Sequence, residues 1–132
     1  MSKYNKLQLD IESVFSTTAW KAESIAAYPG NFEGEIGAKE FVKIELLPSS
    51  SEDMFGHFSG IEGQVIIQIY VPAGQGMTRV LAVADILDTY FQAKRFANGT
   101  STGSSALNII GKDKANPALY RADYTVDFTL FN

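Results

Sequence analysis

The sequence contains no cysteine, which excludes disulfide bonds, thiolate zinc sites and thiol nucleophiles. It contains a single histidine, His57, so any Ser-His-Asp triad has to be built around that residue. One histidine and scattered carboxylates also give no cluster with the spacing of metal ligands. We therefore expect no metal, no cofactor and no enzymatic activity.

Positive charge is also scarce. The chain carries 11 Lys and Arg against 15 Asp and Glu, with a formal net charge of −4 and a pI near 4.9, so no overall field attracts nucleic acid or an anionic membrane. No stretch approaches the ~18 apolar residues of a membrane span. The start, "MSKYNKLQLDIESVF", lacks the apolar core of a secretory signal. We expect synthesis in the cytoplasm, and neither nucleic acid nor membrane as a partner.

Apolar residues are present in ordinary proportion, at 45% of the 132 residues, and aromatic residues make up 12%. A chain of this length fits one domain, since domains most often hold roughly 100–150 residues. We interpret residues 1–132 as a single folded domain.

Two segments have the apolar spacing of amphipathic helices. From Tyr4 to about Thr18, one face carries Leu7, Ile11, Val14 and Phe15. From Thr78 to about Ala93, a broader stripe carries Val80, Leu81, Ala84, Leu87, Tyr90 and Phe91. Both helices are expected to bury these faces on a sheet.

Alternation of apolar and polar residues predicts the strands. They are expected near Ile25–Tyr28, at Phe41–Leu47, from about His57 to Val71, near Ala106–Ile110 and in the closing "YRADYTVDFTLFN". The run "PSSSED", residues 48–53, is expected to end the second strand. This order predicts an α+β fold: a mixed, mainly antiparallel β-sheet with two α-helices packed on one face.

The segment Gly74-Gln75-Gly76 stands between a strand and a helix, which is the setting of a phosphate-binding loop. A P-loop requires a lysine after its last glycine, and this chain has Met77-Thr78-Arg79. A dinucleotide loop requires a third glycine where Arg79 stands. We interpret the segment as a strand-to-helix corner, with Thr78 or a neighbouring group capping the helix.

Paired carboxylates suggest one further chemistry, glycoside hydrolysis. The pairs are Glu52 with Asp53 and Asp123 with Asp127. Asp123 and Asp127 lie on the polar face of the last strand, where exposure to solvent explains them better than catalysis.

Ile66 and Tyr70 lie on the face of their strand opposite to Val65, Ile67 and Ile69. Partly apolar residues on both faces predict a strand that is covered on both sides or that meets another subunit. Ile66 and Tyr70 are therefore candidate interface residues. Replacement of either by Glu is expected to block assembly without unfolding the monomer.

Three segments together resemble a known family: "FVKIELLPSSS", then "IEGQVIIQIYVPAGQGMTRVLAVADILDTYF", then a Gly/Ser-rich loop followed by "ALYRADYTVDFTLFN". This order resembles the tail terminator and minor tail proteins of long-tailed bacteriophages, the protein U-like family. The strand that ends in "IYVPAGQG" and runs into a long helix ending in "DTYF" carries most of the resemblance. It spans most of the chain and is weakest at Ala19–Lys39.

The resemblance implies a structural protein of a phage or prophage. Members assemble as a ring, six-fold in the family, on the last ring of the tail tube, where they stop tube growth and present a surface to the head. The implied partners are other copies of the chain, the tail tube protein and the head-completion protein, in the tail of the virion. A head-completion or connector protein at the same junction and a small-ligand-binding α+β module remain as alternatives.

Two polar segments are expected to be loops that become ordered on contact with tail or head proteins. The first, "PSSSEDMFGHFSG", contains the candidate interface residues His57 and Phe58. The second, "ANGTSTGSS", Ala97–Ser105, contains the candidates Asn98, Gly99, Thr100, Ser101, Thr102 and Gly103. Deletion of Asn98–Gly103 is expected to leave folding intact and to abolish tail completion.

Overall fold

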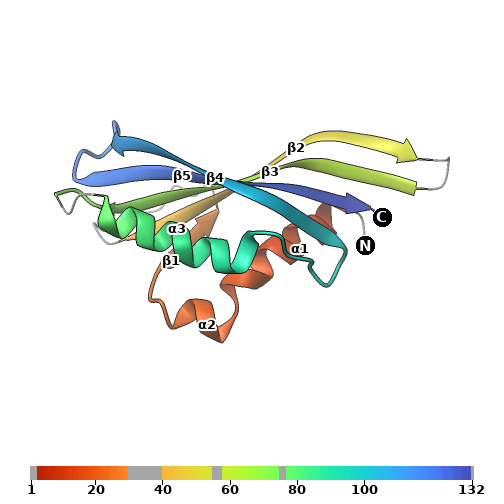
Figure 1. The fold of residues 1–132 in the computed structure, drawn as a ribbon, viewed down its shortest axis with the longest axis horizontal. Coiled ribbons are helices and arrows are strands. Elements are labelled where there is room, and N and C mark those ends of the chain that lie inside the picture. The colour runs from red at the N-terminus through yellow and green to blue at the C-terminus, as the bar shows by residue number, and fades with distance from the viewer. Residues whose placement is uncertain (1–2, 30–39, 55–57, 75–76, 132) are drawn as a thin grey trace.

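The computed structural model describes residues 3–29, 40–54, 58–74 and 77–131, of which 49–54, 58, 59 and 131 are described by their backbone. Its elements are α1 (Lys3–Phe15), α2 (Thr18–Lys21), β1 (Ala26–Pro29), β2 (Phe41–Met54), β3 (Phe58–Pro72), α3 (Thr78–Phe91), β4 (Thr100–Lys112) and β5 (Leu119–Phe131). Figure 1 shows a long, twisted sheet with the helices against one of its faces. The predicted α+β class is confirmed.

Within the described residues, the sheet has five strands in the order β1-β2-β3-β5-β4. The short β1 pairs with β2 in parallel, and every other pair is antiparallel. β3 is therefore central, and β1 and β4 form the two edges. The β2–β3 hairpin extends beyond the part of the sheet that the helices cover (Figure 1).

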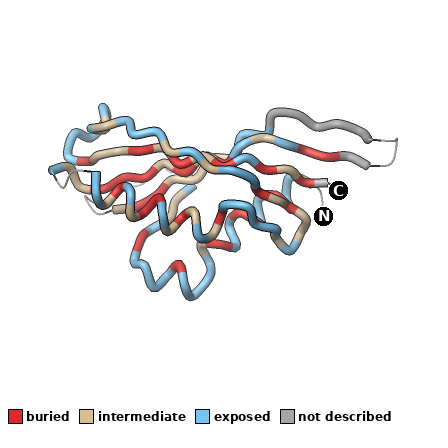
Figure 2. Tube along the Cα trace, in the orientation of Figure 1, coloured by how far each residue is buried: buried red, intermediate tan, exposed pale blue. Residues whose placement is uncertain are grey.

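The core lies between the helices and the inner face of β3 and β5 (Figure 2). Val65, Ile67 and Ile69 of β3 are fully buried there and stand opposite Val126, Tyr124 and Ala122 of β5. Each fully buried aliphatic side chain stabilises the fold by about 1.5–3 kcal/mol. The helices contribute most of their predicted stripes: Leu7, Ile11 and Val14 from α1, and Val80, Ala84, Leu87 and Phe91 from α3. Val83 is also buried and was not predicted, whereas Leu81, predicted on the α3 stripe, is 44% exposed, and Phe15 and Tyr90 are only partly buried.

Two predicted loops are wrong in extent. β2 does not end at "PSSSED" but continues to Met54, with a register shift between Pro48 and Ser50. β4 begins at Thr100, so more than half of the predicted loop Ala97–Ser105 is strand. Both segments have weak strand propensity, but each lies beside a strongly patterned partner, β3 or β5, and the ladder with that partner overrides local preference.

Local capping also differs from expectation. The short helix α2 was not predicted; the Thr17 side chain caps it by accepting a hydrogen bond from the Trp20 backbone N–H at 3.2 Å. Met77 occupies the N-cap position of α3 and makes no side-chain cap, so the expected capping by Thr78 or a neighbour is wrong. At the other end of α3, Ala93 takes a positive φ of 52°, the left-handed conformation that commonly terminates helices.

Candidate functional site

One cluster of polar side chains joins α3 to β4 and β5. The Tyr124 hydroxyl and the Ser105 hydroxyl each donate to Asp88 Oδ1 at 2.6 Å. They line a shallow pocket of about 190 Å³ with Leu81, Ala84 and Leu107. Both hydroxyl protons are directed to one carboxylate, so the cluster satisfies a half-buried aspartate and fastens α3 to the sheet.

This cluster predicts a loss of stability in alkaline solution. Burial, followed by the hydrogen bond to Asp88, raises the pKa of Tyr124 well above its ordinary value of 10.0. A folded-state pKa above the unfolded value gives stability that is complete below about pH 10 and is lost as pH rises further, because only the unfolded chain then releases the proton. In denaturant unfolding between pH 8 and about 11, the free energy of unfolding should fall as the pH rises above about 10. In Tyr124→Phe the decline should be shallower; an unchanged slope would contradict the assignment.

Asp10 forms a second polar site between α1 and the start of β4. Its side chain is 2% exposed; Oδ1 accepts from the Asn98 backbone N–H at 2.9 Å and from Asn98 Nδ2 at 3.0 Å, and Oδ2 accepts from the Thr100 N–H at 3.1 Å. The segment expected to be free for partner proteins is therefore fastened to the first helix. The sequence does hold a signal for this role, because Asp10 lies on the apolar stripe of α1 between Leu7 and Ile11.

The candidate contact residues that follow are also structural. Thr100 and Thr102 are 0% and 8% exposed, and the Thr102 hydroxyl donates to the carbonyl oxygen of Phe91. Thr100, Ser101 and Thr102 pair with Leu130, Thr129 and Phe128 of β5. Deletion of Asn98–Gly103 would remove these pairs and all three donors to Asp10, so, contrary to the sequence-based expectation, we expect it to destabilise the fold. Asn98 and Gly99 occupy a turn, and Gly103 is exposed in the strand.

Residues Gly99–Gly103 also match the Gly-x-Ser-x-Gly pattern of hydrolase nucleophile elbows. An elbow requires a sharp turn between a strand and a helix. Ser101 instead lies in β4, opposite Thr129. The context that the motif needs is absent here.

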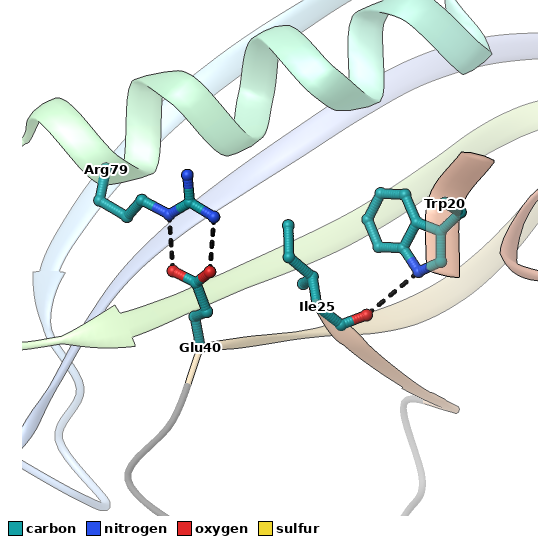
Figure 3. Close-up of polar contacts among 4 residues, drawn as sticks. All are labelled: Trp20, Ile25, Glu40 and Arg79. Atoms are coloured by element: carbon teal, nitrogen blue, oxygen red, sulfur yellow. Dashed lines mark hydrogen bonds and ion pairs between the residues drawn. The ribbon is translucent and has the colours of Figure 1, made fainter. Parts of the chain in front are cut away.

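An ion pair fastens the first turn of α3, just after the strand-to-helix corner, to the start of β2 (Figure 3). Arg79 of α3 donates from Nε to Glu40 Oε2 at 2.6 Å and from Nη2 to Glu40 Oε1 at 2.5 Å. The pair connects the first turn of α3 to the residue before β2. Gly74 takes a positive φ of 93°, which only glycine adopts at low cost. Gln75 and Gly76 lie outside the described residues.

The outer face of the sheet carries a small aromatic cluster. The Tyr70 ring stacks on Phe41 with centroids 4.7 Å apart, and Lys43 Nζ and Arg121 Cζ lie 5.7 and 5.8 Å from its centroid. Tyr70 is 6% exposed, and burial raises the pKa of its hydroxyl. The expectation that Tyr70 is available to another subunit is therefore wrong, since Phe41 and Leu119 cover it within the chain.

Ile66 does lie on this outer face, half-buried, between Glu45 of β2 and Thr125 of β5. Polar groups surround it. Asp123 pairs with Arg121 at 3.0 Å, and exposed Asp127 accepts from Gln64 Nε2 at 3.3 Å. These contacts agree with the interpretation of both aspartates as surface residues rather than an acid/base pair.

Within the described residues, each of the two edges of the sheet is unpaired for part of its length. Among the described residues, β1 pairs only with Phe41–Ile44 of β2, so β2 has no second partner strand beyond Ile44. On the opposite edge, Lys94 covers the start of β4, where its carbonyl accepts from the Thr102 N–H. Beyond Gly103, no second strand pairs with β4 in the described parts of the chain. Unpaired strand edges are sites at which another chain can add.

A groove of about 790 Å³ adjoins the open stretch of β2. We call it the α1–β2 groove; it lies between α1, the end of β1 and the β2 residues Ile44–Pro48. Its walls are mainly apolar: Leu7, Ile11 and Phe15 of α1, and Ile44, Leu46 and Leu47 of β2. The charged residues in its lining, Glu12 and Glu45, are both acidic.

The remaining candidates lie outside the residues whose side chains the structure describes. His57 lies outside the described residues. Phe58 is the first residue of β3, and Glu52 and Asp53 lie within β2; all three are described by their backbone alone. Within the described chain, no group of three or more His, Cys, Asp or Glu side chains has the arrangement of a metal site. None of the described helices has both the length and the apolar character needed to cross a membrane.

Comparison with known proteins supports the fold alone. Neither a protein-family model nor a curated protein matches the sequence. A solved structure that carries no functional name superposes with a TM-score of 0.68 over 98% of this chain and 96% of its own. The two sequences are 14% identical, so the likeness shows a shared fold. Function has to be argued from the residues of this chain, because one fold can serve many functions.

Proposed function

We propose that this protein is a structural tail protein of a phage or prophage, which caps the tail tube as a ring, terminates tail growth and forms the surface for the head. The observation that carries the proposal is that, in the described parts of the chain, two opposite edges of one sheet are each unpaired for part of their length. A ring of identical subunits needs two different surfaces that meet head to tail. The edge formed by β2 beside the α1–β2 groove and the edge formed by β4 are two such different surfaces.

Two further findings support an assembly role. The polar clusters at Asp88 and Asp10 are directed at the chain's own elements. The order of segments resembles the tail terminator family, in which rings are six-fold. The proposed partners are accordingly further copies of the chain, the tail tube protein and the head-completion protein.

The experiment that tests the proposal is the mass and shape of the purified protein, by light scattering and negative-stain imaging, with and without tail tubes. Closed rings, or caps at tube ends, are expected. A protein that stays monomeric and does not bind the tubes at high protein concentration would contradict the proposal and favour the connector or ligand-binding alternatives. A thermal-shift screen with nucleotides and sugars would then test the ligand-binding alternative.

The outer face gives a paired prediction. Ile66→Glu should cost only about 1 kcal/mol of stability, because the side chain is half-buried on the outer face, and the folded variant should lose tube capping. Tyr70→Glu should cost about 3 kcal/mol or more, because it places a carboxylate within the aromatic cluster. Denaturant unfolding and tube capping measure the two effects. Equal destabilisation, or full capping by Ile66→Glu, would contradict the assignment of this face.

A further inference from the structure

We infer that the open end of β4 in one copy of this chain occupies the α1–β2 groove of the next copy. The inference rests on the proposed ring and specifies which surfaces meet. The occupying segment is Asn108–Lys112, which we call the β4 tail. Ile109 and Ile110 are consecutive on it and 36% and 48% exposed, so two neighbouring apolar side chains are available for contact with another surface.

Strand direction is compatible with this contact. β1 and β2 run together, β3 opposes them, β5 runs with them and β4 opposes them. If the sheet continues from β4 of one copy to β2 of the next, the two strands are antiparallel, as are the pairs β2–β3, β3–β5 and β4–β5 within the sheet. The sheet order therefore allows a continuous sheet through successive copies.

The faces of the two strands also match. Ile109 stands opposite Ala122, and Ile44 stands opposite Ile67, so both isoleucines lie on the helix-covered face. In a continuous sheet, Ile109 would meet the same layer as Ile44 and Leu46 of the groove. The available edge is short, because it starts where β1 ends, opposite Ile44, and Pro48 lacks the N–H needed for pairing.

Charge favours this occupant over an unrelated apolar segment. The groove carries Glu12 and Glu45. The tail ends at exposed Lys112, and exposed Lys114 follows beside the half-buried Asp113. Opposite charges on two surfaces steer their encounter and set their register more than they add affinity. A second copy of the chain thus supplies both the apolar and the basic groups that the groove matches.

The absence of cysteine permits a direct test by crosslinking. Leu47 is 48% exposed in the groove and Ile110 is 48% exposed on the tail, so single variants Leu47→Cys and Ile110→Cys should both fold. Mixed and treated with a short bis-maleimide, they should form a heterodimer in large excess over either homodimer. The double variant should form a ladder of dimers, trimers and larger species. Leu9→Cys, 47% exposed on α1, replaces Leu47→Cys as the control and should give neither product.

A charge reversal provides an independent measurement. Glu45→Lys and Lys112→Glu should each reduce the yield of heterodimer several-fold, and their combination in complementary chains should restore it. Crosslinks that do not exceed the Leu9→Cys control, or that favour homodimers, would overturn the inference. Rings by imaging without these crosslinks would refute this pairing and leave the proposed function standing. Crosslinked ladders from a protein that forms no ring or cap would support this pairing of surfaces and refute the proposed function.

Discussion

Asp10→Ala is expected to destabilise the protein by about 3–5 kcal/mol, which corresponds to about 10–20 °C in Tm for a domain of this size. The carboxylate is buried and accepts three hydrogen bonds from Asn98 and Thr100. Its removal leaves buried donors without partners, including the Thr100 N–H, and frees the turn before β4 from α1. Thermal and denaturant unfolding, monitored by circular dichroism, measure the loss.

Two variants separate the role of the carboxylate from a general effect on α1. Asp10→Asn keeps one acceptor oxygen and should lose less than the alanine variant. Glu12→Ala, which removes an exposed carboxylate from the same helix, should change stability by no more than about 0.5 kcal/mol. If Asp10→Ala behaved like Glu12→Ala, the fastening of α1 to β4 would be refuted.

Trp20→Ala is expected to have an effect of similar size, a loss of about 3–5 kcal/mol. Trp20 is 2% exposed, and its ring meets the Phe15 ring edge-on at a centroid distance of 4.9 Å. Its Nε1–H donates to the carbonyl oxygen of Ile25 at 3.1 Å, which holds the chain before β1 (Figure 3). Alanine would leave a cavity beneath α2 and an unsatisfied carbonyl.

Trp20→Phe should recover part of this loss, because it restores apolar contact and lacks only the N–H donor. Leu81→Ala, at a residue of α3 that is 44% exposed, serves as the control and should be nearly neutral. The measurement is the free energy of unfolding in urea for the three variants. A neutral Trp20→Ala would show that α2 does not contribute to the core.

Local patterns were sufficient for the elements that bury one clear face. The stripe of Leu7, Ile11 and Val14 predicted α1, and the alternation of Val65, Ile67 and Ile69 predicted β3. The closing strand and α3 were predicted in the same way. In each case the residues that form the core repeat at the period of the element itself, so the signal is contained in a short window.

Long-range pairing decided the extents of β2 and β4. "PSSSED" and "ANGTSTGSS" have the composition of loops, and their strand character comes from β3 and β5, which lie elsewhere in the chain. The same reason explains the candidate site. Asp10 meets residues that are 88 and 90 positions away, and the spacing of its own helix shows only that a carboxylate lies on an apolar face.

The sequence by itself determined the α+β class, most of both helix stripes, the central strands, and the absence of thiol chemistry and of a second histidine. Only the tertiary structure decided that Tyr70 is covered by Phe41, that Thr100 and Thr102 are buried, and that the α1–β2 groove and the β4 tail lie on opposite edges of one sheet. The physical reason is that periodicity reports which face of an element is buried. Which element covers that face, and which edge stays open, depends on contacts between distant parts of the chain.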